Sequence, residues 1–85
     1  MIDSLDRQIV ALIAVRQVQV VRAAKLKQGQ PTDAVRAPAR VGEVISKVRD
    51  LATTEGASPD VVEAVYRAMI AAFTTLELTI HEQPT

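Results

Sequence analysis

Several residue types that build chemical sites are missing or scarce in this sequence. Its 85 residues include no cysteine and no tryptophan, with one histidine, one tyrosine and one phenylalanine. The lack of cysteine excludes disulfides and thiolate metal sites. His81 cannot form a zinc site by itself, so we expect no metal. The two aromatics, Tyr66 and Phe73, offer no platform on which nucleic-acid bases could stack, so no nucleic-acid partner is expected.

Long apolar runs are absent too. No stretch of about 18 uninterrupted apolar residues occurs, so we expect no transmembrane helix and no membrane partner. No charged segment followed by an apolar one opens the chain, which favours a cytoplasmic location. Residues 1–85 have the size of a single domain, yet 48% of them are apolar and 24% charged. A monomer this short buries only about 60% of its unfolded surface, so the composition favours burial between subunits.

The charges are unevenly distributed although the formal net charge is zero. The segment from residue 16 to residue 40 contains one acidic residue, Asp33, and six basic ones: Arg16, Arg22, Lys25, Lys27, Arg36 and Arg40. A local basic cluster in a neutral protein suits a small anionic ligand better than a nucleic-acid tract. The alternative is that most of these cations lie on solvated helix surface.

The first predicted helix runs from about Ile2 to Gln28. It contains neither proline nor glycine, and its apolar residues recur at helical spacing. Gly29 and Pro31 end it, and a loop to about Arg36 is expected to follow.

Two further helices follow this loop. One begins near Pro38, a residue suited to a first helical turn, and ends at Gly56 as its C-cap. Ser58 is expected to cap the other helix, which starts at Pro59 and runs to about Glu82. Its residues 64–73 are apolar on nearly every side, which predicts deep burial. The fold class predicted is therefore all-α, with three helices per chain.

The length of the first helix predicts a dimer. About 26 residues give a helix of roughly 39 Å. A compact monomer of this size has a radius of gyration of only about 12 Å. We therefore expect a homodimer in which the long helices of two chains pack together. The alternative is a kinked three-helix bundle of one chain, although no Gly or Pro lies where the kink would be needed.

Charged residues interrupt the apolar stripe of the first helix. At helical spacing, Leu12 is followed by Arg16, Val20, Ala23 and Lys27, so both cations fall on the side predicted to be buried. Buried charges are costly unless they are paired. An anionic group should therefore meet Arg16 and Lys27.

The other two helices repeat this pattern. Arg40 lies four residues before Val44 on the second stripe. Glu77 continues an apolar face of the third helix, at spacings of four, three and four along Tyr66, Ile70 and Phe73. Glu77 could form a structural salt bridge with an arginine, or three cations and one carboxyl could line a pocket for a dicarboxylate. The excess of cations favours the pocket, since the arginine fork binds both oxygens of a carboxylate.

The segment IDSLDRQIVALIAVRQ with VRAAKLK resembles the first helix of the helical (class II) chorismate mutases, a family that includes the isochorismate-pyruvate lyases. The family pattern falls on Ile2, Asp3, Asp6, Ile9, Arg16 and Lys27. The segment RAPARV resembles the start of the family's second helix and places the family's substrate-binding arginine at Arg40. In the family's last helix, the position that holds Gln or Glu corresponds to Glu77. The resemblance and the interrupted stripes select the same four charged residues.

This resemblance implies an intertwined helical homodimer that rearranges chorismate, a small dicarboxylate, to prephenate without any cofactor. By the same resemblance, Lys27 and Glu77 are the catalytic residues. Arg16 and Arg40 would bind carboxylates, Lys27 the ether oxygen and a carboxylate, and protonated Glu77 the ether oxygen. Val41 and Phe73 complete the expected substrate contacts, although spacing alone favours a core role for Phe73.

Three departures from the family pattern keep alternatives open. An arginine of the family pattern would fall before Met1. Where the mutases usually have a glutamate this chain has Val41, and where they have an aspartate it has Ala37. The APARV and VRAAKLK segments look closer to the isochorismate-pyruvate lyases. The alternatives are therefore an isochorismate-pyruvate lyase, a mutase that acts on an amino-substituted chorismate, or a non-catalytic regulatory partner of another shikimate-pathway enzyme.

Overall fold

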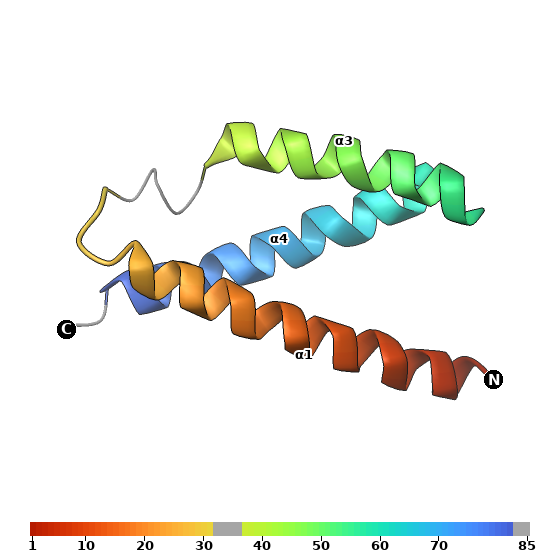
Figure 1. Cartoon of the computed structure of the whole chain (residues 1–85), viewed down its shortest axis with the longest axis horizontal. Coiled ribbons are helices and arrows are strands. Elements are labelled where there is room, and N and C mark those ends of the chain that lie inside the picture. Colours follow the sequence, from red (N-terminus) through yellow and green to blue (C-terminus); the bar gives the residue numbers. More distant parts are fainter. Residues whose placement is uncertain (32–36, 83–85) are drawn as a thin grey trace.

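The computed structural model describes residues 1–31 and 37–82, which form three α-helices and no strand (Figure 1). The helices are α1 (Ile2–Leu26), α3 (Pro38–Glu55) and α4 (Pro59–Glu82). The predicted all-α fold class is confirmed. The loop predicted to end at Arg36 falls mostly on residues 32–36, outside the described residues. None of the described helices is both long and apolar enough to span a membrane.

The helix ends are defined by local backbone chemistry. Gly56 ends α3 in the left-handed conformation, with φ 79°, which costs glycine little because it lacks a Cβ. The Ser58 hydroxyl accepts a hydrogen bond of 3.3 Å from the backbone N–H of Val61, so it caps α4 as predicted. Pro38 and Pro59 are the first residues of their helices.

Helix α4 packs against both other helices. Its C-terminal part lies beside the end of α1, where Ala24 and Ile80 are buried and the Gln28 amide donates to the Ile80 carbonyl oxygen at 2.9 Å. Helix α3 packs along α4 (Figure 1), and Ile45 and Val48 of α3 are buried. This arrangement places the second half of α1, the start of α3 and the second half of α4 around a common space.

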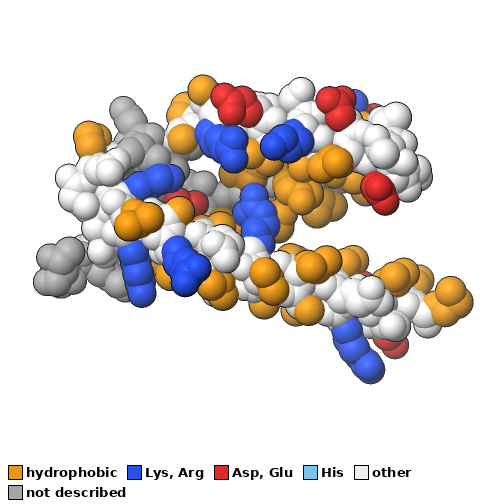
Figure 2. All heavy atoms as spheres, viewed as in Figure 1, with side chains coloured by type: hydrophobic (Ala, Val, Ile, Leu, Met, Phe, Trp, Pro, Cys, Tyr) orange, Lys and Arg blue, Asp and Glu red, His pale blue; other side chains and the backbone are white. Residues whose placement is uncertain are grey.

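The N-terminal half of α1 extends away from the other two helices (Figure 1). The chain measures 43 × 27 × 15 Å with a radius of gyration of 14.5 Å, above the value of about 12 Å expected for a compact chain of this size. The predicted stripe of Leu5, Ile9 and Leu12 is 54%, 54% and 69% exposed. Its predicted burial is thus not found within the described part of one chain, because no helix there covers it. Apolar side chains are visible along the face of α1 shown in Figure 2.

Burial of α4 is also shallower than predicted. Within residues 64–73 only Phe73 is buried, while Val65 is 57% exposed and Tyr66 half-buried. The reason is that α4 has only two neighbouring helices, which leave part of its circumference uncovered. A single chain therefore leaves apolar surface exposed on both α1 and α4.

An ion-pair cluster fixes the turn between α3 and α4. Arg49 contacts Asp60 at 3.0 Å and Glu63 at 2.8 Å, and Arg67 contacts Glu63 at 2.7 Å. These contacts join the second half of α3 to the first turns of α4.

Candidate active site

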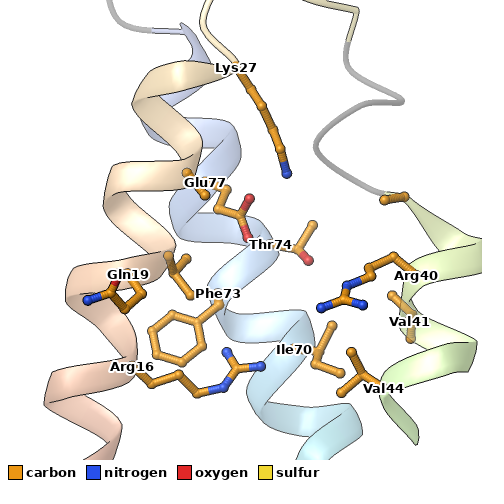
Figure 3. Close-up of a pocket in the computed structure, with 13 residues that line it drawn as sticks. Arg16, Gln19, Lys27, Arg40, Val41, Val44, Ile70, Phe73, Thr74 and Glu77 are labelled. Atoms are coloured by element: carbon orange, nitrogen blue, oxygen red, sulfur yellow. The ribbon is translucent and has the colours of Figure 1, made fainter. Parts of the chain in front are cut away.

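A pocket of about 340 Å³ opens between the three helices (Figure 3). Helices α1 and α4 form two of its sides, and the start of α3 forms the third. The residues that line it are Arg16, Gln19, Val20, Ala23, Lys27, Ala37, Arg40, Val41, Val44, Ile70, Phe73, Thr74 and Glu77. The four charged residues predicted from the interrupted stripes are thus brought together around one cavity.

Arg16 lies at one end of the pocket on two aromatic rings. Its guanidinium carbon is 5.6 Å from the centroid of the Phe73 ring and 5.9 Å from that of Tyr66. Rings attract a cation at this distance and leave the planar fork free along its edges. Arg16 is half-buried, so its charge is only partly solvated.

Lys27 and Arg40 enter the pocket from different helices. Lys27, at the end of α1, extends its ammonium group toward the same space as Glu77 (Figure 3). Arg40, in the first turn of α3, is more exposed and contacts Glu43 of the next turn at 3.4 Å. Three cations therefore surround the pocket from α1 and α3, an arrangement suited to a ligand with more than one negative charge.

Glu77 is a half-buried carboxyl facing these cations. Burial raises its pKa above the ordinary value, while the positive charges of Lys27 and Arg16 act in the opposite direction. Among the described residues no ion pair includes Glu77, so the salt bridge considered for it with Arg16 or Arg40 is not formed. The carboxyl remains available to a ligand.

An apolar wall completes the pocket. Val41 and Val44 from α3 face Ile70 and Phe73 from α4 (Figure 3). Phe73 is 7% exposed, so it belongs to the core as its spacing indicates, and one side of its ring also lines the cavity. Val41 lines the pocket as well, which brings both apolar residues of the predicted site to it.

Two uncharged polar residues of the pocket, Gln19 and Thr74, were missed by the sequence interpretation. Gln19 lies three residues after Arg16, and Thr74 lies four after Ile70 and three before Glu77. Both share a helix face with residues that the interpretation selected, so helical spacing could have found them. They were missed because a neutral residue on a helix does not interrupt an apolar stripe as a charge does.

His81 is half-buried, and its ring contacts the Gln30 carbonyl oxygen away from the pocket. In the described part of the chain, no three His, Asp or Glu side chains gather where they could hold a metal ion.

Comparison with known proteins assigns this fold and pocket to a family. Residues 1–78 match the family described as chorismate mutase type II. No curated protein and no solved structure matches the chain significantly. The matched segment includes all three helix cores and every residue that lines the pocket, and on this basis the chain belongs to the chorismate mutase type II family.

Proposed function

We propose that this chain is a chorismate mutase that converts chorismate to prephenate in the pocket between α1, α3 and α4. The observation that carries the proposal is the convergence of Arg16, Lys27, Arg40 and Glu77 on one cavity within a chain of this family. Three cations and one carboxyl match a substrate that has two carboxylates and an ether oxygen.

The reaction itself needs no proton transfer and no covalent intermediate. The ether C–O bond breaks while a C–C bond forms within the same molecule, so atoms and charge balance without a co-reactant. The protein contributes by holding the side chain of chorismate over its ring and by stabilising negative charge on the breaking ether oxygen. Both tasks require fixed polar groups rather than a nucleophile.

Each charged residue then has a role that follows from its place. Arg16 and Arg40, on opposite sides of the pocket, bind the two carboxylates through their planar forks. Lys27 reaches the ether oxygen and one carboxylate. Glu77, which burial favours in the protonated form, donates a hydrogen bond to the ether oxygen.

We infer that the active form is a homodimer in which α1 of each chain covers the other. The support is the exposed apolar surface along α1, which includes Leu5, Ile9, Leu12 and Val15. Each square ångström of apolar surface that is removed from water contributes about 25 cal/mol. Association of two chains through this surface would therefore be favourable. The cytoplasmic location expected from the sequence remains part of this proposal.

Isochorismate-pyruvate lyase activity in the same pocket is the second candidate. It is favoured by Val41 and Ala37, which line the pocket where the mutase pattern has Glu and Asp. In this reaction the ether C–O bond of isochorismate breaks while the hydrogen on the hydroxyl-bearing ring carbon moves to the enolpyruvyl methylene, which releases pyruvate and leaves salicylate. The electrostatic demands resemble those of the mutase, because charge again develops on the ether oxygen.

A side-by-side assay of the purified chain with chorismate and with isochorismate tests both candidates. Prephenate is followed in one reaction, and salicylate with pyruvate in the other. We expect prephenate formation to dominate and to fall by about two orders of magnitude or more in Arg16→Ala. Dominant pyruvate release would replace the mutase by the lyase, and no turnover of either compound by folded protein would refute both.

A further inference from the structure

The threonines of the described helices differ in how they use their hydroxyl groups. The hydroxyls of four of them donate to the backbone carbonyl oxygen four residues earlier, at 3.1 to 3.4 Å: Thr53, Thr54, Thr75 and Thr79. This bond is the usual way in which a helical threonine satisfies its donor. Thr74 is the exception among helical threonines of the described ranges, since its hydroxyl makes no such bond.

Thr74 instead lines the pocket. It is half-buried on α4, and Figure 3 shows its side chain between Glu77 and Arg40, directed into the cavity. The adjacent Thr75 is exposed and bonded to the carbonyl oxygen of Ala71. Two neighbouring threonines of one helix therefore have different environments, and only the hydroxyl of Thr74 is available to a ligand.

The chemistry of the substrate indicates what this hydroxyl contacts. Chorismate and isochorismate each have one ring hydroxyl, on a carbon next to the one that bears the ether oxygen. A group beside Glu77, which we place at the ether oxygen, is therefore close to that hydroxyl. A threonine hydroxyl can both donate and accept, so it matches another hydroxyl without adding charge.

The other pocket residues are poorer partners for a ring hydroxyl. The three cations can only donate, and the proposed function assigns them to carboxylates and the ether oxygen. Val41 and Val44 offer no polar atom, and Gln19 is an exposed residue of α1. Thr74 is thus the uncharged, half-buried polar side chain in the described part of the pocket.

We propose that Thr74 is a specificity-determining residue that hydrogen-bonds the ring hydroxyl of the substrate. This inference rests on the proposed function and deepens it. Loss of one neutral hydrogen bond in a partly buried site lowers affinity by about three- to tenfold. A substrate or analogue without the ring hydroxyl should lose nothing when the Thr74 hydroxyl is removed.

The test compares Thr74→Val, which keeps the side-chain shape, with Thr74→Ser, which keeps the hydroxyl. Thr75→Val is the matched control, because it removes a hydroxyl from the next residue of the same helix. Steady-state rates are measured with chorismate and isochorismate, and calorimetric binding with both compounds and with 4-deoxychorismate. Circular dichroism and thermal melting confirm that each variant is folded.

We expect Thr74→Val to raise KM for the better substrate about three- to tenfold with a smaller effect on kcat. Binding of 4-deoxychorismate should stay within about twofold of the wild type, and Thr74→Ser and Thr75→Val should resemble the wild type. An equal loss for 4-deoxychorismate would show that Thr74 contacts a carboxylate or acts structurally, and would overturn the inference. Unchanged binding of all three compounds would overturn it too.

The failure of this inference is distinguishable from failure of the proposed function. Turnover by the wild type with no selective effect of Thr74→Val refutes only the role of Thr74. If the wild type turns over neither compound, the proposed function fails, and the calorimetric comparison still decides the role of Thr74. Absence of binding by the folded wild type would refute both.

Discussion

The guanidinium carbon of Arg16 lies 5.6 Å from the centroid of the Phe73 ring, at the boundary between the core and the pocket. The ring is buried on one side, while its other side lines the cavity. Arg16 therefore rests on a surface that the core holds in place, and its orientation depends on a residue that carries no charge.

Replacement of Phe73 by leucine should weaken carboxylate binding. The change removes the ring under Arg16, and a cation–π contact at a partly exposed site contributes about 0.5–1 kcal/mol, or two- to fivefold in affinity. We expect KM for chorismate to rise by that factor, with a lower Tm because a core residue becomes smaller. Tyr66→Leu, which removes the half-buried second ring, provides the comparison; an unchanged KM in both variants would contradict a role for the rings.

The pH dependence of the rate should follow the protonation of Glu77. Burial raises the pKa of this carboxyl against the opposing effects of Lys27 and Arg16. The protonated form donates to the ether oxygen, whereas the ionised form repels the charge that develops there. The rate should therefore be highest below the Glu77 pKa and fall about tenfold per pH unit above it.

Glu77→Gln is the variant that checks this explanation, because an amide donates a hydrogen bond at every pH. Its profile of kcat/KM should be flat between about pH 5 and 8. A wild-type rate that does not change across this range would refute the role of protonated Glu77. A slope that persists in Glu77→Gln would assign the titration to another group.

Much of the site could be predicted because charges on apolar stripes are conspicuous in a helical sequence. Arg16, Lys27 and Glu77 interrupt regular spacings, and the structure places all three around one pocket. The neutral Thr74 could not be found in this way, since a threonine on a helix does not interrupt an apolar stripe as a charge does. The helix ends were predictable for a similar reason, because Gly56 and Ser58 act through local backbone chemistry.

Burial was the part that sequence patterns predicted least well. The apolar stripe of Leu5, Ile9 and Leu12 identifies a surface that prefers to be buried, but the pattern does not name the element that covers it. Within one chain, none of the described helices covers this stripe. The three helices of a single chain therefore account for the pocket. Under our proposal, a second copy of the chain covers the apolar side of α1.

A charge placed on this stripe should separate the proposed dimer. Ile9 is 54% exposed in the single chain, so Ile9→Asp costs little there but places an unpaired charge in the interface of a dimer. We expect a dissociation constant at least 100-fold weaker by analytical ultracentrifugation, with loss of activity. Ser46→Asp, on the exposed side of α3, adds the same charge elsewhere and should leave the dimer intact. If Ile9→Asp sedimented with the same dimeric mass as the wild type, an interface at this position would be refuted.

The ion-pair cluster between α3 and α4 should make stability depend on pH in the acid range. Hydrogen bonds from Arg67 and then from Arg49 lower the pKa of Glu63. A carboxylate with a lowered pKa stabilises the fold above its unfolded pKa, and this contribution disappears as the pH falls through its folded value. Glu63→Gln should therefore lower the Tm by a few degrees at pH 7, because partly exposed ion pairs contribute little each.

The difference in Tm between wild type and Glu63→Gln should shrink as the pH falls below the folded pKa of Glu63, and also as salt screens the charges. Glu55→Gln neutralises an exposed carboxyl at the end of α3 that has no ion-pair partner among the described residues, so it should leave the Tm nearly unchanged. Melting curves from pH 2 to 7 distinguish the two variants. A Tm difference for Glu63→Gln that persists at the lowest pH would contradict an ionic origin of the effect, since protonated Glu63 and glutamine have nearly the same shape and neither carries a charge.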